Sequence, residues 1–261
     1  LHTSSAVGDL EERVKTQVDA GATRIVVAGG DGSVYEAVNG IMRSERSAAL
    51  GLVPTGTGND YAKACEFSLN WEHAARLLAD RLIAGQPART IDIGIMNERY
   101  FSNGAGIGFD AKVTQLARAY RLPIGDLVYL LAIFRAMIDG IATPRMRIET
   151  AGISWDGPAT LAAISNGPWI GGMFHIAPMA ANNDGKLELM IADPVTRRRI
   201  VALLPKLMSG RHVDEPEIQH HSVENLTVTA DEPVASHLDG EVQPLQKRFE
   251  IRLLANALCL L

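Results

Sequence analysis

Two short, mainly apolar segments, residues 23–28 and 49–53, constrain the fold more than any other feature of the chain. A helical pattern precedes each of them, and in the first pattern Leu10, Val14 and Val18 recur at a spacing of four residues. Strands that are apolar along their length, without polar alternation, are typical of a parallel sheet covered by helices on both faces. The start of the chain therefore predicts a doubly wound α/β unit.

Each apolar segment is followed by a glycine-rich loop, "GGDGS" after the first and "TGTGND" after the second. In an open parallel sheet, ligands bind beyond the carboxyl ends of the strands, so both loops should face one crevice. Glycine lets the backbone approach an anion closely, and the start of the next helix offers free N–H groups with a partial positive charge. Phosphate is the expected ligand. The residues expected to contact it are Gly29, Gly30, Asp31, Gly32, Ser33, Gly56, Thr57, Asn59 and Asp60.

Either loop alone could be a tight strand-to-helix connection with Asp31 or Ser33 as the N-cap. Together they outline a nucleotide site in which Asp31 and Asp60 could hold Mg²⁺ or its waters. The site is not a Walker A loop, because the sole Gly-Lys pair, Gly185-Lys186, is followed by Leu187.

The pattern changes at Arg89. Alternating apolar residues at 91–95, and then a turn, predict a half-buried hairpin. We read residues 104–108 as a glycine-rich packing loop and the pair at 220–221 as a solvated turn. The second part of the chain is therefore predicted to be mostly antiparallel β. Further strands are expected at 145–150, 159–165, 186–192, 223–229 and 248–254, with helical stretches at about 110–140 and at 197–210.

Composition excludes several classes of protein. A formal net charge of −5 without a long basic block argues against nucleic-acid binding. Cys65 and Cys259 are far apart, which suggests neither a disulfide framework nor a zinc site and favours a cytoplasmic protein. The apolar runs are shorter than the roughly 20 residues of a membrane span. The chain begins with Leu and shows no signal peptide, so we expect that a preceding segment is missing.

The segment His237-Leu238-Asp239-Gly240-Glu241 is the last candidate for chemistry. If it is extended, His237, Asp239 and Glu241 share one face. The alternative, favoured without further context, is a hairpin turn at Asp239-Gly240. A kinase, however, needs a carboxylate that accepts the proton of the attacking hydroxyl.

Five stretches carry a resemblance to a known family, in this order along nearly the entire chain: "GGDGSVYEAVNG", "GLVPTGTGNDYAKA", "IDIGIMNERYFSNGAGIGFDAKV", "NNDGKLEL" and "HLDGE". The set closely resembles the catalytic domain of bacterial diacylglycerol kinases, soluble lipid kinases related to NAD kinase and sphingosine kinase. The resemblance implies an α/β + β fold. A NAD kinase-like nucleotide-binding domain would span residues 1–88, with residues 252–261 returning to it, and a β-sandwich-like domain would span 89–251.

The resemblance also implies roles for residues. Gly29 to Tyr35 would line the ATP phosphates, with Thr57 near them, and Ser4, or the adjacent Thr3, would match a threonine of the family. Glu241 would be the general base with Asp239 beside it, while Asp31 and Asp60 would organise the catalytic Mg²⁺. A structural Mg²⁺ site, compatible with an Asp-Gly turn, would use Asp184 and the backbone carbonyls of Ala181 and Lys186.

The chain departs from the family at two positions and at its start. Family members usually have Asn where Tyr35 stands and Thr where Ser33 stands, and Tyr35 is the larger change. Most also begin with a strand that ends in Asn-Pro, and that element is absent from this sequence. If the sequence is the whole polypeptide, the resemblance no longer predicts ATP binding.

The expected function is that of an ATP-dependent lipid kinase, with diacylglycerol as the default acceptor. The alternatives are a NAD kinase-like enzyme and a degenerate, non-catalytic module that binds nucleotide or lipid. A lipid kinase would contact the inner membrane face peripherally, through residues 127–134 or through a basic helix with Arg197, Arg198, Arg199, Lys206 and Arg211. Core packing and a solvated face explain the same two segments more simply. The partners expected are ATP, a membrane-derived lipid alcohol and, in a homodimer, a second copy of the chain.

Overall fold

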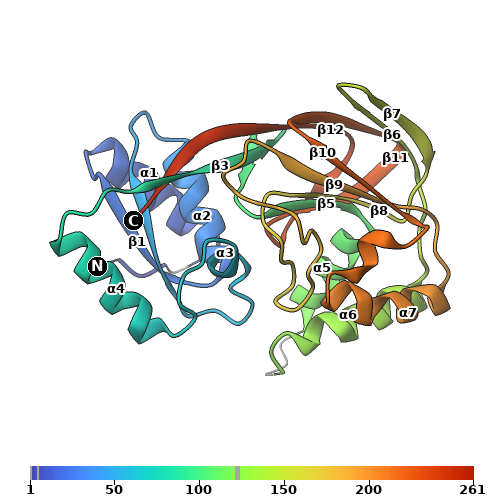
Figure 1. The fold of residues 1–261 in the computed structure, drawn as a ribbon, viewed down its shortest axis with the longest axis horizontal. Coiled ribbons are helices and arrows are strands. Elements are labelled where there is room, and N and C mark those ends of the chain that lie inside the picture. The colour runs from blue at the N-terminus through green and yellow to red at the C-terminus, as the bar shows by residue number, and fades with distance from the viewer. Residues whose placement is uncertain (1, 5, 121–123) are drawn as a thin grey trace.

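The computed structural model describes residues 2–4, 6–120 and 124–261, which fold into two lobes side by side (Figure 1). The N-terminal lobe contains α1 (Asp9–Asp19), β1 (Arg24–Gly29), α2 (Asp31–Met42), β2 (Ala49–Pro54), α3 (Asp60–Ala64) and α4 (Trp71–Ile83). The strands of the second lobe are β3 (Arg89–Met96), β4 (Arg99–Phe101), β5 (Gly104–Gly108), β6 (Arg145–Thr150), β7 (Ile153–Pro158), β8 (Leu161–Ser165), β9 (Leu187–Ala192), β10 (Ile218–Val223), β11 (Asn225–Leu238) and β12 (Glu241–Leu260). Its helices are α5 (Phe109–Ala119), α6 (Leu127–Asp139), α7 (Arg197–Met208) and the 3-10 helix η1 (Arg211–Asp214).

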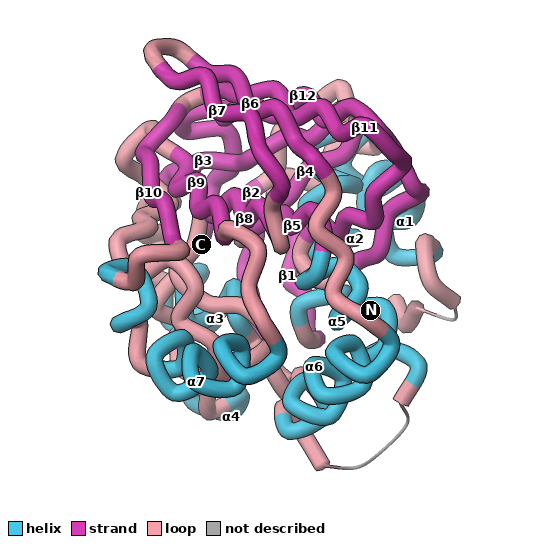
Figure 2. Tube along the Cα trace, turned by 90° about the vertical axis from the view of Figure 1, so that its right-hand side faces the viewer, coloured by secondary structure: helices cyan, strands magenta, loops and turns pink. Residues whose placement is uncertain are grey.

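Strands of both lobes join in one sheet. β1 and β2 are parallel, and the end of β12 pairs with β2 in the same direction, at Cys259 and Leu260. β3 runs antiparallel to β12, so these two strands link the lobes (Figure 1). The rest of the second lobe is antiparallel β, with α5, α6 and α7 on one side of the sheet (Figure 2). The predicted α/β + β fold class is confirmed.

Apolar residues from distant segments form the cores. In the N-terminal lobe, Val18, Val38 and Leu52 pack with Leu258 and Leu260 of β12. A second core lies among the strands of the second lobe, and a third lies in its helical layer, where Phe109, Ile133 and Ile200 pack together. Because the last strand contributes to the first core, the start and end of the chain stabilise each other.

Several local expectations are wrong. Residues 104–108 are not a loop but β5, between β8 and β11, and the pair at 220–221 lies within β10 and not in a turn. Asp156-Gly157-Pro158, a sequence typical of turns, belongs to β7, and the hairpin formed by β6 and β7 turns at Gly152 instead. The helical stretch at 110–140 is two helices, and residues 121–123 lie outside the described residues. Sheet pairing has overridden the local turn signals in these strands.

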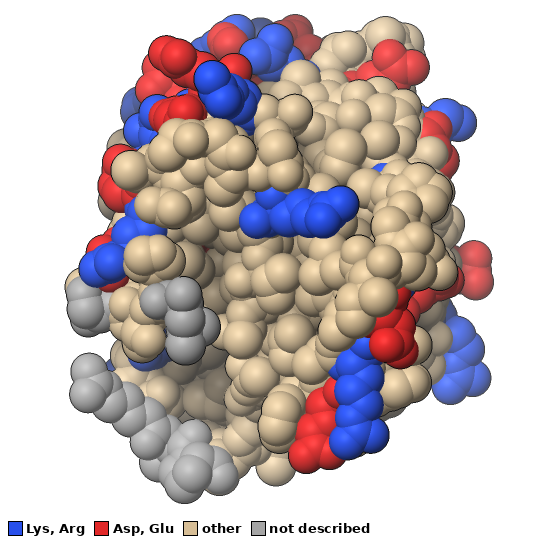
Figure 3. All heavy atoms as spheres, turned by 90° about the vertical axis from the view of Figure 1, so that its left-hand side faces the viewer, with Lys and Arg blue, Asp and Glu red and all other residues tan. Residues whose placement is uncertain are grey.

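The outer face of the N-terminal lobe is less covered than predicted. β1 is an edge strand, and Val26 is 49% exposed, so this strand is not buried on both faces. Leu77 and Ile83 of α4 are exposed as well. Figure 3 shows this side of the molecule, with charged groups mainly near its edges and a largely uncharged middle. Within the described part of the chain, no helix combines the length and apolarity that a bilayer crossing requires.

Candidate active site

The two glycine loops meet, as the strand order predicts. A Cβ atom added at Gly56 would lie 2.4 Å from the Cα of Gly30, and one added at Gly30 would lie 3.0 Å from the Cα of Gly56. The N–H of Thr55 donates to the carbonyl of Gly29 at 3.0 Å. Only residues without side chains allow this approach, so the glycines bring the ends of β1 and β2 into one surface.

The start of α2 faces that surface without a side-chain cap. Gly30 is the N-cap residue and makes no side-chain hydrogen bond, so neither Asp31 nor Ser33 acts as the cap. Ser33 instead packs closely against Gly29. The N–H groups of the first helical turn and the positive end of the helix dipole therefore remain suited to an anion.

Asp31 and Asp60 lie together beside the loops. Asp31 accepts a hydrogen bond from the N–H of Tyr61 (3.1 Å), and the Asp60 carboxylate accepts from the N–H of Gly172 (3.0 and 3.1 Å) and from Lys63 (3.2 Å). Burial, with the nearby charge of Asp60, raises the pKa of Asp31 to about 6. A cation between the carboxylates would offset this repulsion.

The carboxylate pair fits Mg²⁺ that arrives with a nucleotide. Among the described residues, no three His, Cys, Asp or Glu side chains form a metal cluster. Mg²⁺ is commonly held by one or two carboxylates together with substrate phosphates and water. Asp31 and Asp60 could therefore supply the protein's share of such a site.

Of the other predicted site residues, Asn59 stabilises its own loop, whereas Thr57 and Ser4 are accessible from outside. Asn59 has a left-handed backbone (φ 51°), and its amide closes the loop by bonding Gly56 at 3.1 and 2.7 Å. The loop thus engages the Asn59 side-chain oxygen and one of its two N–H donors. Thr57 lines an outer recess with Asp31 and Asp60. Ser4 is exposed, and its hydroxyl donates to the carbonyl of Ala6.

Tyr35 does not line the loop surface as expected. Its side chain is buried, and its hydroxyl accepts from the Arg99 Nε at 3.3 Å, with the guanidinium over the ring. Arg99 in turn forms a bidentate ion pair with Glu11 of α1 (2.6 and 2.8 Å). Tyr35 therefore belongs to an internal network that joins α1 and α2 to β4.

The segment from His237 to Glu241 is a hairpin turn and not an extended face. Asp239 (φ 48°) and Gly240 (φ 84°) connect β11 to β12. The Asp239 carboxylate accepts four hydrogen bonds, from the N–H and hydroxyl of Ser102 (2.7 and 2.9 Å) and from the N–H groups of Asn103 (2.9 Å) and Gly104 (2.8 Å). Burial raises the pKa of Asp239 despite these donors. Asp239 fixes the turn that presents Glu241.

Glu241 lies opposite the first turn of α2. A Cβ atom added at Gly32 would lie 3.2 Å from the Glu241 Oε1. Arg118 of α5 forms an ion pair with Glu241 and donates to the carbonyl of Gly240 at 3.1 Å. The structure thus brings the late carboxylate to the glycine loops from the other lobe.

The segment proposed for structural Mg²⁺ forms a turn before β9. Asp184 is exposed and accepts from the N–H of Lys186 (3.0 Å), and the N–H of Gly185 donates to Asp92 (2.8 Å). The turn predicted there is confirmed. The ligand set of Asp184, Ala181 and Lys186 stays a prediction.

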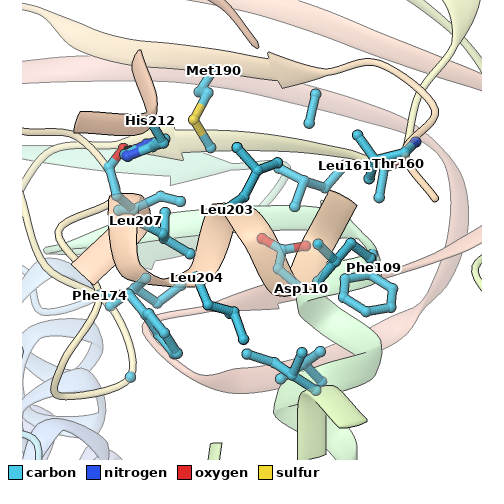
Figure 4. Close-up of a pocket in the computed structure, with 18 of the residues that line it drawn as sticks. Phe109, Asp110, Thr160, Leu161, Phe174, Met190, Leu203, Leu204, Leu207 and His212 are labelled. Carbon is cyan, nitrogen blue, oxygen red and sulfur yellow. Dashed lines mark hydrogen bonds between the residues drawn. The ribbon is translucent and has the colours of Figure 1, made fainter. Parts of the chain in front are cut away.

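A polar recess between the lobes continues into an apolar cavity. Asp31, Asp60 and Asp239 line the recess, and residues of α5, α6 and α7 line the cavity, whose volume is about 140 Å³ (Figure 4). Residues common to both are Thr114, Tyr129, Ile170, Gly171 and Ile176. The sequence reading missed this cavity, because apolar helical positions such as Ile133 look the same whether they face a core or a hollow.

Known proteins are similar to the chain over both lobes. Residues 1–95 match the family model described as the diacylglycerol kinase catalytic domain, and residues 103–260 match the YegS C-terminal NAD kinase beta sandwich-like domain. A protein named diacylglycerol kinase from Bacillus subtilis is 30% identical, with 92% of this chain and 78% of that protein covered. A protein named "probable lipid kinase YegS-like" from Yersinia enterocolitica is 30% identical over 96% of this chain and 82% of its own length.

Solved structures share the fold. A crystal structure described as a diacylglycerol kinase from Bacillus anthracis superposes with a TM-score of 0.71 and 20% identity, covering all of this chain and 83% of that one. Another, of a candidate diacylglycerol kinase from the same organism, gives a TM-score of 0.79 at 23% identity, covering 98% of this chain and 83% of that one. With the matches over both lobes, these similarities show that the chain belongs to the family of bacterial diacylglycerol kinases and YegS-like lipid kinases.

Proposed function

We propose that this protein transfers the γ-phosphoryl group of ATP to the hydroxyl of a lipid, with diacylglycerol as the simplest acceptor and phosphatidic acid as its product. A kinase family implies ATP as the donor. The observation that carries the proposal is that Glu241 lies beside the glycine loops, next to two carboxylates, Asp31 and Asp60, that also line a recess continuing into an apolar cavity.

In this proposal the nucleotide phosphates lie at the start of α2, and Asp31 with Asp60 holds Mg²⁺. Bound there, Mg²⁺ neutralises phosphate charge. Glu241 accepts the proton of the lipid hydroxyl. The hydroxyl oxygen forms a bond to the γ-phosphorus, while the bond between the γ-phosphorus and the oxygen that stays with ADP breaks. Asp239 positions Glu241 through the hairpin turn, and Arg118 orients the Glu241 carboxylate by their ion pair.

The apolar cavity favours lipid over the alternatives. An NAD kinase-like enzyme needs room for a polar dinucleotide, whereas side chains such as Phe109, Leu204 and Leu207 line this cavity (Figure 4). A non-catalytic module would not require a carboxylate placed opposite the glycine loops. The retained arrangement of Asp31, Asp60 and Glu241 therefore supports catalysis.

We further propose that α6 contacts the membrane. Its exposed residues Leu127, Leu131, Phe134 and Ile138 follow one another at helical spacing and form an apolar stripe. The other side of α6 contributes Tyr129 and Ile133 to the cavity, so the stripe lies beside the place where an acyl chain would be held. A cytoplasmic enzyme docked this way would reach lipid from the inner membrane face.

The basic helix offers less for membrane binding than its sequence suggested. Arg199 forms ion pairs with Glu215 and Glu217, and Lys206 pairs with Glu215. Arg197 and Arg198 are exposed. Because these neighbouring acids offset part of the basic charge, the apolar stripe of α6 is the better candidate.

The direct test is to incubate the full-length protein with γ-labelled ATP, Mg²⁺ and separate vesicles that contain diacylglycerol, phosphatidylglycerol or ceramide, with NAD in a parallel reaction. Label in a lipid product is expected. Label in NAD alone, or in no acceptor, would overturn the proposal.

A further inference from the structure

Asp110 and His237 form a buried pair at the boundary between the recess and the cavity. Asp110 lies in the first turn of α5 and lines the apolar cavity, whereas His237 lies near the end of β11 and lines the polar recess. Asp110 Oδ2 and His237 Nε2 are 3.4 Å apart, and the side chains are 16% and 1% exposed, respectively. The pair therefore joins the lining of the cavity to the lining of the recess.

The backbone leaves room for the pair. Gly106 of β5 lies opposite His237 in the sheet. A Cβ atom added at Gly106 would lie 1.8 Å from the Asp110 Oδ2 and 2.4 Å from the His237 Nε2. Glycine at 106 is therefore required for Asp110 and His237 to face each other.

The Asp110 carboxylate retains capacity to accept hydrogen bonds. Its Oδ1 accepts only from the adjacent N–H of Ala111 (2.8 Å), and its Oδ2 has no well-oriented hydrogen-bond partner among the described residues. His237 Nδ1 accepts from the N–H of Gly240 at 3.4 Å, which assigns the proton to the Nε2 that faces Asp110. A carboxylate offers about four acceptor positions, so the present contacts leave some unused.

Asp110 stands in apolar surroundings, among side chains such as Phe109 and Leu203 (Figure 4). Thr160, another polar residue of the cavity, is already satisfied, because its hydroxyl donates to the carbonyl of Asp193 and accepts from the N–H of Val195. A half-buried carboxylate whose acceptor positions are only partly used favours a ligand that brings a further donor.

We infer that Asp110, positioned by His237, binds a hydrogen-bond donor of the acceptor lipid other than the hydroxyl that is phosphorylated. This inference rests on the proposed lipid kinase function. Diacylglycerol has a single hydroxyl, and its two esters only accept hydrogen bonds. The site is therefore built for lipid alcohols with a second donor, such as an amide N–H on the carbon next to the reacting alcohol carbon.

A matched pair of acceptors tests the inference. One is diacylglycerol, and the other is its analogue with the ester oxygen at carbon 2 replaced by an amide N–H, with identical acyl chains. Because a hydrogen bond to a buried charge is strong, kcat/KM for the amide is expected to exceed that for the ester by roughly 10- to 100-fold.

The substitution Asp110→Asn replaces the charged acceptor with a neutral one, so it should lower kcat/KM for the amide more than for diacylglycerol and bring that ratio closer to one. Asp139→Asn is the matched control. Asp139 pairs with Arg135 on α6, and the same substitution there should leave the ratio unchanged. If Asp110→Asn does not fold, Asp110→Val, which suits apolar surroundings, provides the same comparison.

Equal use of both acceptors by the unaltered protein, or an amide preference that survives loss of the Asp110 carboxylate, would overturn the inference and leave the lipid kinase function standing. A loss of activity by Asp110→Asn that is equal for both acceptors would also overturn it, because a purely structural role acts on both alike. If neither acceptor is phosphorylated, the proposed function fails and the inference fails with it.

Discussion

Replacing Asp31 by Asn should stabilise the nucleotide-free protein. Burial and the charge of Asp60 raise the pKa of Asp31 from 3.8 to about 6. Since one pKa unit corresponds to about 1.4 kcal/mol, ionising Asp31 in the folded protein costs up to about 3 kcal/mol. Asp31 is half-buried, so solvent screens part of this cost, and we expect Asp31→Asn to raise the free energy of unfolding by about 1 to 3 kcal/mol above pH 7.

The effect should depend on pH in one direction. Between about pH 4 and pH 6 the folded protein binds more protons at Asp31 than the unfolded chain does, so its free energy of unfolding falls as pH rises through this window. Asn cannot ionise, so the gain from Asp31→Asn should be absent below the window and complete above it. The same substitution should impair Mg²⁺-dependent phosphoryl transfer, because it removes one of the two carboxylates proposed to hold Mg²⁺.

Urea unfolding of both proteins, without nucleotide, at about pH 4 and about pH 7.5 measures this difference. In thermal unfolding at the higher pH, the midpoint temperature of the Asp31→Asn protein should lie about 3 to 10 °C above that of the unaltered protein. Asp139→Asn serves as the control, since an exposed ion pair is worth at most about 1 kcal/mol. A less stable Asp31→Asn protein, or one whose stability gain is the same at both pH values, would refute the reasoning.

Three further predictions concern the turn, the ion pair and the membrane stripe. Asp239→Asn cannot accept all four hydrogen bonds, so it should lower the free energy of unfolding by about 1 to 3 kcal/mol in urea denaturation. Arg118→Gln removes the ion pair with Glu241, so steady-state kinetics should show a kcat lowered by up to about tenfold and a smaller change in KM for ATP. An unchanged kcat would argue against a positioning role for Arg118. The double substitution Leu131→Glu with Phe134→Glu should reduce the affinity for lipid vesicles, measured by sedimentation, at least about tenfold. Activity on a detergent-dispersed acceptor should stay within about threefold. Undiminished sedimentation with vesicles would exclude the α6 stripe as the membrane contact.

Local sequence predicted the elements whose signals are local. The apolar runs at β1 and β2, the helical spacing of Val14 and Val18, and the glycine loops between strand and helix were all visible without a partner. The order of parallel strands then predicted that the two loops would meet, and they do. The helices and the strand ends could thus be placed because they depend on nearby residues, although the N-cap of α2 is Gly30 and not Asp31 or Ser33.

Features that depend on distant partners could not be predicted in this way. The glycines of β5 resembled a loop, but Gly106 is needed because Asp110 and His237 approach it from two other elements. Tyr35 looked like part of the phosphate loop, whereas its actual partner, Arg99, lies far along the sequence. The cavity beneath α6 and α7 has the same apolar composition as a core, so only the packing of the helices reveals it.

Phosphoryl transfer by the Glu241→Gln protein tests the shared site of the glycine loops and Glu241 most directly. Loss of a general base typically reduces the rate by about two to four orders of magnitude, and we expect a reduction of this size. The ATP affinity, measured by calorimetry, should stay within about threefold of that of the unaltered protein, because Glu241 lies opposite the start of α2 and not within the glycine loops. A Glu241→Gln protein that labels lipid at the unaltered rate would contradict the assignment of this site.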